Sequence, residues 1–339
     1  MSHESLPPFK VVSAPQIATW LEENPKIIFD LVCRSYLQHA DGKTVNPDSY
    51  FLRFPDSDKN RIIALPASIE SETPVAGIKW VSSFPSNVDK GLDRASAALL
   101  INDRVTGYPL ACMEGSLISA ARTAASAVVG AQYLHPIPGK ISSLGIIGAG
   151  PIAFGTLTLL SRLGWQIDEL NVCDLSEERA ALFRTKSETI VGKSKTSDLK
   201  TTISESSMIL FATSATVPFV SEKEWFAHAP TILHMSLRDL SADIILASQN
   251  VADDVDHCLK ALTSLHLAKQ KSGHSDFVAG GAAELIRGEI KLDPTRPRIF
   301  SPFGMGILDL AVAQEILNTI SNDNIVLVNN FFPTPYTGQ

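Results

Sequence analysis

The chain has 339 residues and a formal net charge of −7, with 45% hydrophobic and 19% charged residues. This balance is typical of a globular protein whose length favours two domains. Lys and Arg are scattered rather than gathered into a basic stripe, so nucleic acid is not an expected partner. The four cysteines form no CxxC or Cys/His spacing, so we expect no metal site and no disulfide framework.

Residues 1–10 show no basic region followed by an apolar one, so no signal peptide is expected. The stretch 141–161 carries no charge and has the length of a membrane span. It is interrupted, however, by Gly145, Gly148, Gly150, Pro151 and Gly155, which divide it into a strand, a turn and a helix. We therefore expect no membrane partner and a cytoplasmic location.

The first part of the chain mixes helices and strands. Residues 10–40 are predicted to be helical, with Ser13 capping a first helix. Between 50 and 103, the apolar runs YFLRF, RIIALPA, AGIKWVSSF and ASAALLIND predict strands, because Pro, Gly, Asn and Asp separate them. A helix rich in Ala and Leu follows at 116–134. These elements predict an α+β domain.

The next part of the chain alternates between strands and helices. The runs SLGIIG, ELNVCD, SMILFAT, TILHMS and NVADDV predict strands, and helical patterns lie at 177–187 and 258–270. Such alternation predicts a parallel, doubly wound sheet of the Rossmann type. A predicted helix at 305–320 and a predicted strand at 325–328 end the chain and are expected to return to the first domain.

The predicted fold class is thus α/β with two domains. A Rossmann domain is expected over residues 137–304. An α+β domain is expected over residues 1–136 and 305–339, which makes it discontinuous in sequence.

The motif SLGIIGAGPIAFG predicts a dinucleotide site. Gly148, Gly150 and Ala153 match G-x-G-x-x-A directly after an apolar strand and before a helix. The first glycine permits the tight turn, the second lets the backbone approach a pyrophosphate, and the small third residue lets helix and strand pack. The helix N-terminus then offers N–H groups to the phosphates. We expect the cofactor to contact Gly148, Ala149, Gly150, Pro151 and Ile152.

An acid at the end of the second strand of this unit strengthens the prediction. Asp174 follows the run LNVC and can accept both hydroxyls of the adenosine ribose. An acid there repels a 2′-phosphate and no Arg immediately follows it, which favours NAD over NADP. A further strand ends near Thr213 and Ser214, which either line the cofactor or cap a helix.

Four charged residues lie in apolar contexts, where an unused charge is costly. They are Arg53 in YFLRF, Lys79 in AGIKWV, Arg122 in ISAARTAAS and Asp239 after TILHMS. Arginine suits the recognition of carboxylates, and a partly buried lysine can transfer protons near neutral pH. An ordinary ion pair or an extended surface side chain explains any one of them equally well.

These stretches resemble the ornithine cyclodeaminase/mu-crystallin family. The resemblance is carried by RIIALPASI, AGIKWVSSFPSN, DRASAALLINDRVTGYPLACMEGSLISAARTAA, LGIIGAGPIA and SPFGMGILDLA, which span nearly the whole chain. It implies a substrate-binding domain formed by both ends of the chain, a Rossmann domain between them, and a homodimer formed through the substrate domains. The block at 93–125 is similar to the branch that makes L-2,3-diaminopropionate.

The resemblance also implies a reaction and roles for residues. A secondary amine joining diaminopropionate to glutamate would be oxidised by NAD to an imine, and hydrolysis would release 2-oxoglutarate. Arg53 and Arg122 look like the substrate-carboxylate arginines of the family, with Arg94 as a further contact or a surface ion pair. Lys79 and Asp239 look like its acid–base groups, Asp239 being suited to activating the water.

A late turn and one departure complete the resemblance. The turn that contains Met305 resembles the edge of the family's cofactor site. Ornithine cyclodeaminases place an acid near the strand RIIALP to hold the distal amine of ornithine. This chain has Ile63 and Ala64 there, which fits a substrate with more carboxylates.

Three functions remain open at this point. The first is the amine dehydrogenase, which would serve the synthesis of a siderophore or antibiotic precursor. The second is an ornithine cyclodeaminase or a cyclic ketimine reductase. The third is a crystallin-like protein that binds a dinucleotide without turnover, which the presence of Lys79, Arg122 and Asp239 disfavours.

Overall fold

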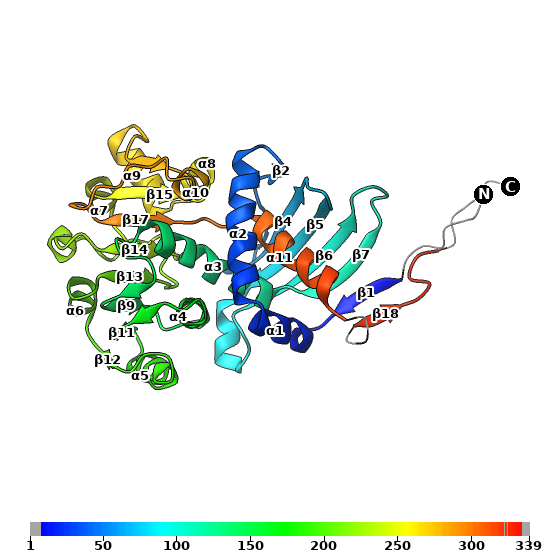
Figure 1. The fold of residues 1–339 in the computed structure, drawn as a ribbon, viewed down its shortest axis with the longest axis horizontal. Coiled ribbons are helices and arrows are strands. Elements are labelled where there is room, and N and C mark those ends of the chain that lie inside the picture. The colour runs from blue at the N-terminus through cyan, green and yellow to red at the C-terminus, as the bar shows by residue number, and fades with distance from the viewer. Residues whose placement is uncertain (1–7, 322, 324, 334–339) are drawn as a thin grey trace. The chain divides into compact units, whose positions relative to one another are not determined.

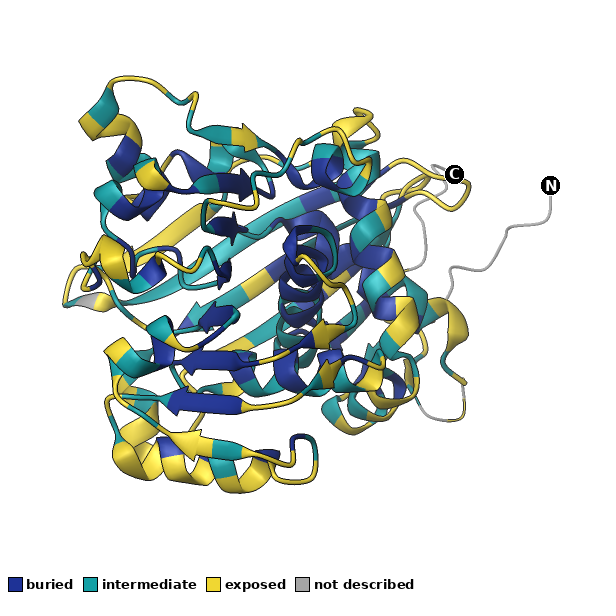
Figure 2. Ribbon diagram, turned by 60° about the vertical axis from the view of Figure 1, so that its left-hand side comes forward, coloured by how far each residue is buried: buried dark blue, intermediate teal, exposed yellow. Residues whose placement is uncertain are grey.

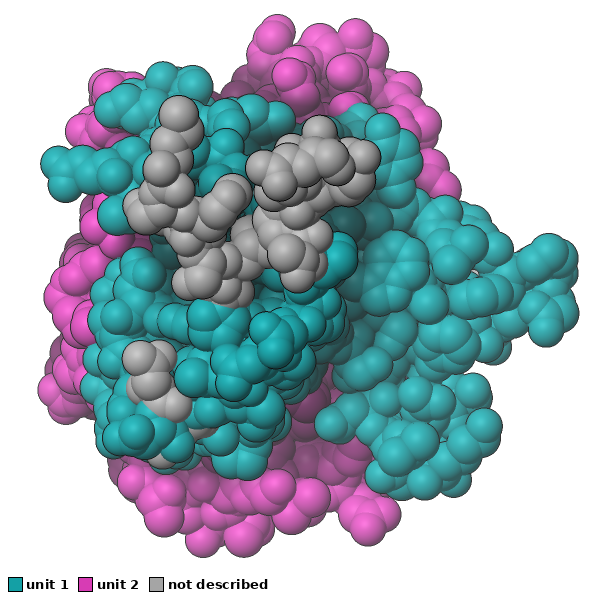
Figure 3. All heavy atoms as spheres, turned by 90° about the vertical axis from the view of Figure 1, so that its right-hand side faces the viewer, with its two compact units in different colours: residues 1–24, 38–119, 305–339 teal, residues 25–37, 120–304 magenta. Residues whose placement is uncertain are grey.

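The computed structural model describes residues 8–321, 323 and 325–333. The predicted absence of a signal peptide therefore concerns a segment of which residues 1–7 lie outside the described part. The chain forms two compact units, coloured in Figure 3. Unit 1 comprises 1–24, 38–119 and 305–339, and unit 2 comprises 25–37 and 120–304. The helices α2 (Pro25–Ala40) and α3 (Ser116–Leu134) run through two of the boundaries.

Unit 1 contains a mostly antiparallel sheet with two further helices. Its strands follow the order β18-β1-β7-β6-β5-β4-β2, and β3 pairs with β4. The elements are β1 (Phe9–Val12), α1 (Ala14–Glu23), β2 (Thr44–Val45), β3 (Tyr50–Phe54), β4 (Ser57–Ile69), β5 (Val75–Ser83), the 3₁₀ helix η1 (Pro85–Lys90), β6 (Ala95–Asp103), β7 (Pro109–Glu114), α11 (Gly306–Thr319) and β18 (Val326–Val328).

The helix α11 lies across β4, β5 and β6 (Figure 1). Successive residues of a strand point to opposite faces, so every second residue of β5 faces α11. Val75, Lys79 and Ser83 are the buried members of that set, whereas Trp80 is exposed on the other face. The last strand, β18, pairs antiparallel with β1, as the predicted return of the tail requires.

Unit 2 contains the predicted Rossmann sheet. Its elements are β8 (Lys140–Ile141), β9 (Leu144–Ile147), α4 (Pro151–Arg162), β10 (Gln166–Ile167), β11 (Leu170–Cys173), α5 (Glu177–Ser187), β12 (Ser194–Thr196), α6 (Leu199–Ser204), β13 (Met208–Phe211), η2 (Lys223–Phe226), β14 (Thr231–His234), α7 (Ala242–Ala247), β15 (Gln249–Ala252), α8 (Val255–Cys258), α9 (Ser264–Ser272), β16 (Val278–Gly280), α10 (Ala282–Ile286) and β17 (Arg298–Ser301).

The sheet of unit 2 is parallel, with the order β12-β11-β9-β13-β14-β17-β15-β16. The five predicted strands are all present, and the predicted fold class is confirmed. The central strands β9, β13, β14 and β17 are buried along their whole length (Figure 2), which explains the unbroken apolar runs of β9 and β13 and the mainly apolar centres of the other two. The strand order reverses between β9 and β13, where ligands of such sheets bind.

Two predicted helical stretches are wrong in part. Residues 258–270 are not one helix, because Ala261 and Leu262 have positive φ angles of 57° and 55° and the chain turns there. Thr263 then caps α9 by accepting the N–H of His266. At the start of the chain, the segment Phe9–Val12 is a strand rather than part of a helix, because it pairs with β7 and β18.

The boundary between the two units lies within α3, after Ser119, and again after Gly304. The predicted domain boundaries at 136/137 and 304/305 concern independently folding domains, which the two compact units do not test. These boundaries stay a prediction. Residues 322, 324 and 334–339 of the predicted discontinuous domain lie outside the described part of the chain.

Candidate active site

The glycine turn connects β9 to α4. Gly148 has φ +94°, and a Cβ at this position would lie 2.6 Å from the carbonyl oxygen of Ala212, so a side chain is excluded. A Cβ at Gly150, the N-cap of α4, would meet nothing within 4 Å. That open space leaves room for a phosphate beside the N–H groups of the first helical turn. The geometry fits the pyrophosphate of a dinucleotide.

Asp174 follows β11 and bonds to the glycine turn. Its Oδ2 accepts the N–H of Ala149 at 2.8 Å, and its Oδ1 accepts the N–H of Ser176 at 2.9 Å. Arg179 also donates to Oδ1, from Nη2 at 2.8 Å, with its side chain 64% exposed. Burial alone would raise the pKa of Asp174, but these donors outweigh it and hold the pKa below its ordinary value.

The ion pair between Asp174 and Arg179 bears on the choice between NAD and NADP. No Arg follows the acid directly, yet Arg179 reaches it from the first turn of α5. Its guanidinium is held by the carboxylate that is expected to bind the ribose hydroxyls. Oδ1 already accepts from Ser176 and from both Nε and Nη2 of Arg179, whereas Oδ2, which accepts the N–H of Ala149, has a second lone pair for a ribose hydroxyl.

Lys79 lies on β5 in unit 1 and is 3% exposed. Its Nζ lies 2.6 Å from Oδ2 of Asp309 and donates to Oγ of Ser119 at 3.0 Å. Asp309 lies in the first turn of α11 and is 0% exposed. An isolated buried charge costs several kcal/mol, so each of the two charges stabilises the other.

Asp239 follows β14 in unit 2, and its side chain is fully buried. The hydroxyl of Thr213 donates to Oδ1, that of Ser236 donates to Oδ2, and Nε2 of His234 lies 3.0 Å from Oδ2. Burial alone would raise the pKa of Asp239, but the His234 contact and the two hydroxyls outweigh it and lower the pKa. Asp239 is therefore an ionised carboxylate at neutral pH.

Arg122 lies on α3, one turn after Ser119. The backbone at Gly304 packs against its guanidinium, because a Cβ added to Gly304 would lie 2.7 Å from Nη1. Gly304 has φ +91°, which also favours glycine. Both residues belong to unit 2.

The remaining predicted residues differ in burial. Arg53 is exposed on β3 with its guanidinium 5.2 Å from the centre of the Phe51 ring, and Arg94 is exposed with Nε 3.4 Å from Oγ of Ser83. Ser214 is exposed, whereas Met305 is buried at the N-cap of α11.

The structure thus connects some of the predicted residues by hydrogen bonds. In unit 2, Asp174 bonds to the glycine turn and Thr213 bonds to Asp239. The predicted convergence of Lys79, Arg122 and Asp239 involves residues of both units and stays a prediction.

A comparison with known proteins decides the family. The model of the ornithine cyclodeaminase/mu-crystallin family matches residues 22–324. The chain belongs to this family.

Two relatives of the chain come from the curated proteins of the family. N-((2S)-2-amino-2-carboxyethyl)-L-glutamate dehydrogenase of Staphylococcus aureus is 27% identical over 318 residues, which cover 91% of this chain and 94% of the relative. Alanine dehydrogenase of Archaeoglobus fulgidus is 29% identical over 304 residues, covering 87% and 90%. Among solved structures, an archaeal alanine dehydrogenase dimer with bound NAD superposes with a TM-score of 0.83 at 25% identity, covering 95% of this chain and 99% of that one.

Two further findings concern metal-binding clusters and membrane-spanning helices. In the described part of the chain, no three or more His, Cys, Asp or Glu side chains are arranged to hold a metal ion. No helix among the residues described is long and apolar enough to cross a membrane.

Sequence reasoning missed three residues around the candidate site. Asp309 lies in the apolar stretch GILDLAVA at the start of α11 and meets the criterion that selected Lys79. His234 is a titratable residue inside a buried strand, which is a similar signal. Ser236 carries no signal of its own, because nothing in its neighbourhood distinguishes it from a loop serine.

Proposed function

We propose that the chain catalyses the NAD-dependent oxidative cleavage of N-((2S)-2-amino-2-carboxyethyl)-L-glutamate. The bond between the glutamate α-carbon and nitrogen is oxidised to an imine, and water hydrolyses the imine to 2-oxoglutarate and L-2,3-diaminopropionate. One NAD⁺ and one water are consumed, and one NADH and one proton are released. NAD, when bound, supplies the hydride acceptor.

The enzyme class and the cofactor follow from the relatives. The predicted enzyme class and cofactor are confirmed, since the relatives are dehydrogenases of amino acids and one of them carries NAD. The chain is therefore an NAD-dependent dehydrogenase that acts on a carbon–nitrogen bond. The residues that fit the cofactor are those of the glycine turn, Asp174 and the small residues after β13.

The observation that carries the proposal is the buried Lys79–Asp309 pair. Such a pair adds little to stability compared with an apolar replacement, so its presence calls for a function. In the proposed reaction Lys79 takes part in proton transfer at the reacting nitrogen, and Asp309 holds the ammonium in place. Ser119 accepts a further hydrogen bond from Nζ and helps to fix its direction.

The sheet face that carries Lys79 supports a substrate with several carboxylates. Leu65 is the cross-strand partner of Lys79, so Ile63, two residues earlier on β4, shares its face. No acid stands there to hold a distal amine. On the same face Arg61 lies directly opposite Arg53 in the register of β3 and β4. Arginine is the preferred partner of carboxylates, and the proposed substrate has three of them.

Asp239 and Arg122 complete the proposed assignment. Asp239 is held in the ionised form that a general base requires. Because its carboxylate is fully buried, a proton reaches it through the half-buried residues whose hydroxyls it contacts, Thr213 and Ser236. Arg122, held against Gly304, binds a carboxylate of the amino acid.

We also propose that the enzyme is a homodimer formed through unit 1. The middle of the sheet face opposite α11 is apolar: two cross-strand rows there are Ala64, Trp80 and Ala98, then Pro66, Ile78 and Leu100. Trp80 and Leu100 are 45% and 38% exposed in the single chain. A contiguous exposed apolar patch of this kind marks an interface. Trp80→Lys is expected to shift the sedimentation coefficient to that of a monomer, and an unchanged dimer would contradict the proposal.

The activity is tested with purified protein, NAD and the glutamate–diaminopropionate conjugate. Steady NADH formation with equal amounts of 2-oxoglutarate and diaminopropionate is the expected result. Conversion of ornithine to proline and ammonia without net NADH would overturn it in favour of a cyclodeaminase. NADH oxidation with a cyclic ketimine would indicate a reductase, and tight NADH binding without any turnover would indicate a binding protein.

A further inference from the structure

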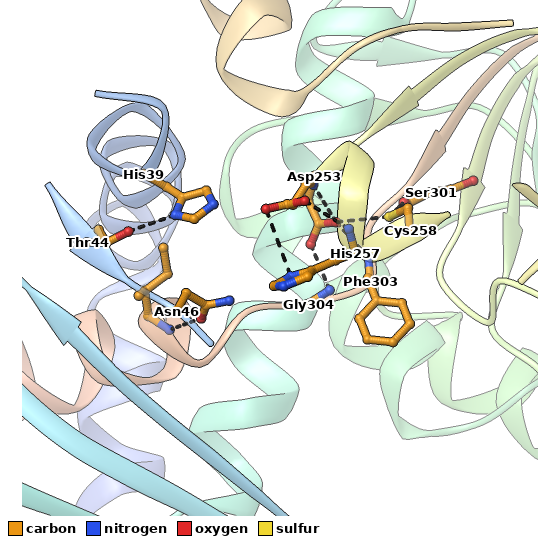
Figure 4. Close-up of polar contacts among 11 residues, drawn as sticks. His39, Thr44, Asn46, Asp253, His257, Cys258, Ser301, Phe303 and Gly304 are labelled. Carbon is orange, nitrogen blue, oxygen red and sulfur yellow. Dashed lines mark hydrogen bonds and ion pairs between the residues drawn. The ribbon is translucent and has the colours of Figure 1, made fainter. Parts of the chain in front are cut away.

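Asp253 is a buried carboxylate that the proposed reaction does not use. It follows the last residue of β15 and is 5% exposed. Its Oδ1 accepts the N–H groups of Asp254 at 2.9 Å and Phe303 at 2.8 Å, and its Oδ2 accepts that of Gly304 at 2.7 Å. The Sγ of Cys258 lies 3.2 Å from Oδ1. Figure 4 shows the carboxylate between Cys258 and the backbone of residues 303 and 304.

The two bonds to Phe303 and Gly304 fix the last turn of unit 2. A carboxylate that accepts backbone N–H groups makes charge-assisted hydrogen bonds, which are about twice as strong as neutral ones. Burial nevertheless raises the pKa of Asp253, although the N–H donors oppose the shift. Burying an acid here therefore costs free energy. In return, its carboxylate holds the backbone of residues 303–304 in place.

This turn is in contact with Arg122. The space that a Cβ of Gly304 would fill is occupied by the guanidinium, 2.7 Å from Nη1. The charges of Asp253 and Arg122 also lie close to the same buried hydroxyl, that of Tyr36. Burial raises the pKa of Tyr36, the charge of Asp253 raises it further, and the charge of Arg122 opposes both. Asp253 thus acts on Arg122 through the turn, and the two charges lie near the same buried group.

We propose that Asp253 is a positioning residue for Arg122, and that it sets the place where a carboxylate of the amino-acid substrate binds. The inference rests on the proposed function, because Arg122 is assigned to the substrate there. Asp253 itself touches neither substrate nor cofactor in this proposal.

The first test needs no substrate. Asp253→Asn is expected to speed hydrogen exchange at the amides of Phe303 and Gly304 about tenfold or more, the scale of one lost charge-assisted hydrogen bond. It is also expected to speed the modification of Arg122 by phenylglyoxal several-fold, measured by mass spectrometry. Unchanged exchange and unchanged modification would overturn the proposal, whatever the substrate of the enzyme is.

The matched control is Cys258→Ala. It removes the thiol from the same buried cluster and lowers the melting temperature, but it leaves the three N–H bonds of Asp253 in place. Exchange at residues 303–304 and the modification of Arg122 are expected to stay within about twofold of wild type. If Cys258→Ala changed them as much as Asp253→Asn does, general loosening of the core would explain the result and the proposal would be wrong.

The second test uses the kinetics of the holoenzyme. Asp253→Asn is expected to raise the KM for the amino acid about tenfold, with the KM for NAD within about twofold. Gly304→Ala, which places a methyl group against Arg122, is expected to do the same and replaces Asp253→Asn if that variant does not fold. In an Arg122→Lys background, Asp253→Asn is expected to add little, because the two residues act as one unit.

The outcomes of the two tests separate the two proposals. Additive effects of Asp253→Asn and Arg122→Lys, or equal increases of both KM values, would overturn the positioning role. A wild-type enzyme that leaves the conjugate unchanged would overturn the proposed function, while the exchange and modification experiments still decide the role of Asp253.

Discussion

Two buried carboxylates, Asp309 in unit 1 and Asp239 in unit 2, are stabilised in different ways. The carboxylate of Asp309 lies 2.6 Å from the ammonium of Lys79, so it faces an opposite charge. The carboxylate of Asp239 accepts hydrogen bonds from two hydroxyl groups and contacts one imidazole. Neutralising Asp309 leaves a buried cation beside it, whereas neutralising Asp239 disturbs a hydrogen-bonded group. The first change should therefore destabilise the fold more than the second.

The largest effect is expected from Asp309→Asn. The substitution removes the carboxylate that faces the buried Lys79 ammonium, and the free energy of unfolding should fall by about 3–5 kcal/mol. Urea denaturation measures this change. In the control, Lys79→Met is combined with Asp309→Leu, which removes both charges and should recover most of the loss. A double variant as unstable as Asp309→Asn would contradict the comparison.

Asp239→Asn should affect turnover more than stability. The loss of a proton-transfer group lowers turnover about a hundredfold or more. The free energy of unfolding should fall by about 1–3 kcal/mol, the cost of disturbing one buried hydrogen-bonded group. Steady-state kinetics and urea denaturation give the two values. A loss of stability larger than that of Asp309→Asn would reverse the expected order of the two substitutions.

The free energy of unfolding that a buried carboxylate contributes should also depend on pH. The pKa of Asp239 is lower in the folded chain than in the unfolded chain, so its contribution to stability is present above the unfolded pKa, about 3.9, and is lost as the pH falls through the folded value. The difference in unfolding free energy between wild type and Asp239→Asn should therefore shrink in acid. Asp253, whose folded pKa is raised, should show the opposite trend. A difference that grows in acid for Asp239→Asn would contradict the lowered pKa of Asp239, and one that shrinks in acid for Asp253→Asn would contradict the raised pKa of Asp253.

The smallest effect is expected at the cofactor site. Asp174→Ala should raise the KM for NAD about tenfold while turnover stays within about twofold, because the acid binds the adenosine half, far from the chemistry. The substitution also releases Arg179, so activity with NADP should rise. Asp174→Ala combined with Arg179→Ala is the control and should lose that gain. An Asp174→Ala enzyme with wild-type kinetics for both cofactors would refute the assignment.

Local sequence patterns predicted the Rossmann unit well, because its determinants are local. The strands β9 and β13 are buried on both faces and read as unbroken apolar runs, and Gly148 is required by the dihedral angles of its own turn. The break between α8 and α9 was missed, since Ala261 and Leu262 are residues that rarely adopt a positive φ. Here the caps and packing of the neighbouring helices override the helical pattern.

The sequence by itself singled out Lys79, Arg122 and Asp239, since a charge inside an apolar run is visible without a structure. The same criterion also selected Arg53, which is exposed, and it was not applied to Asp309, which is buried. Only the tertiary structure decided their partners. Asp309 is 230 residues away from Lys79, Thr213 is 26 residues from Asp239, and Gly304 is 51 residues from Asp253. No periodicity connects such positions, because the strand order and register of the folded sheets bring them together.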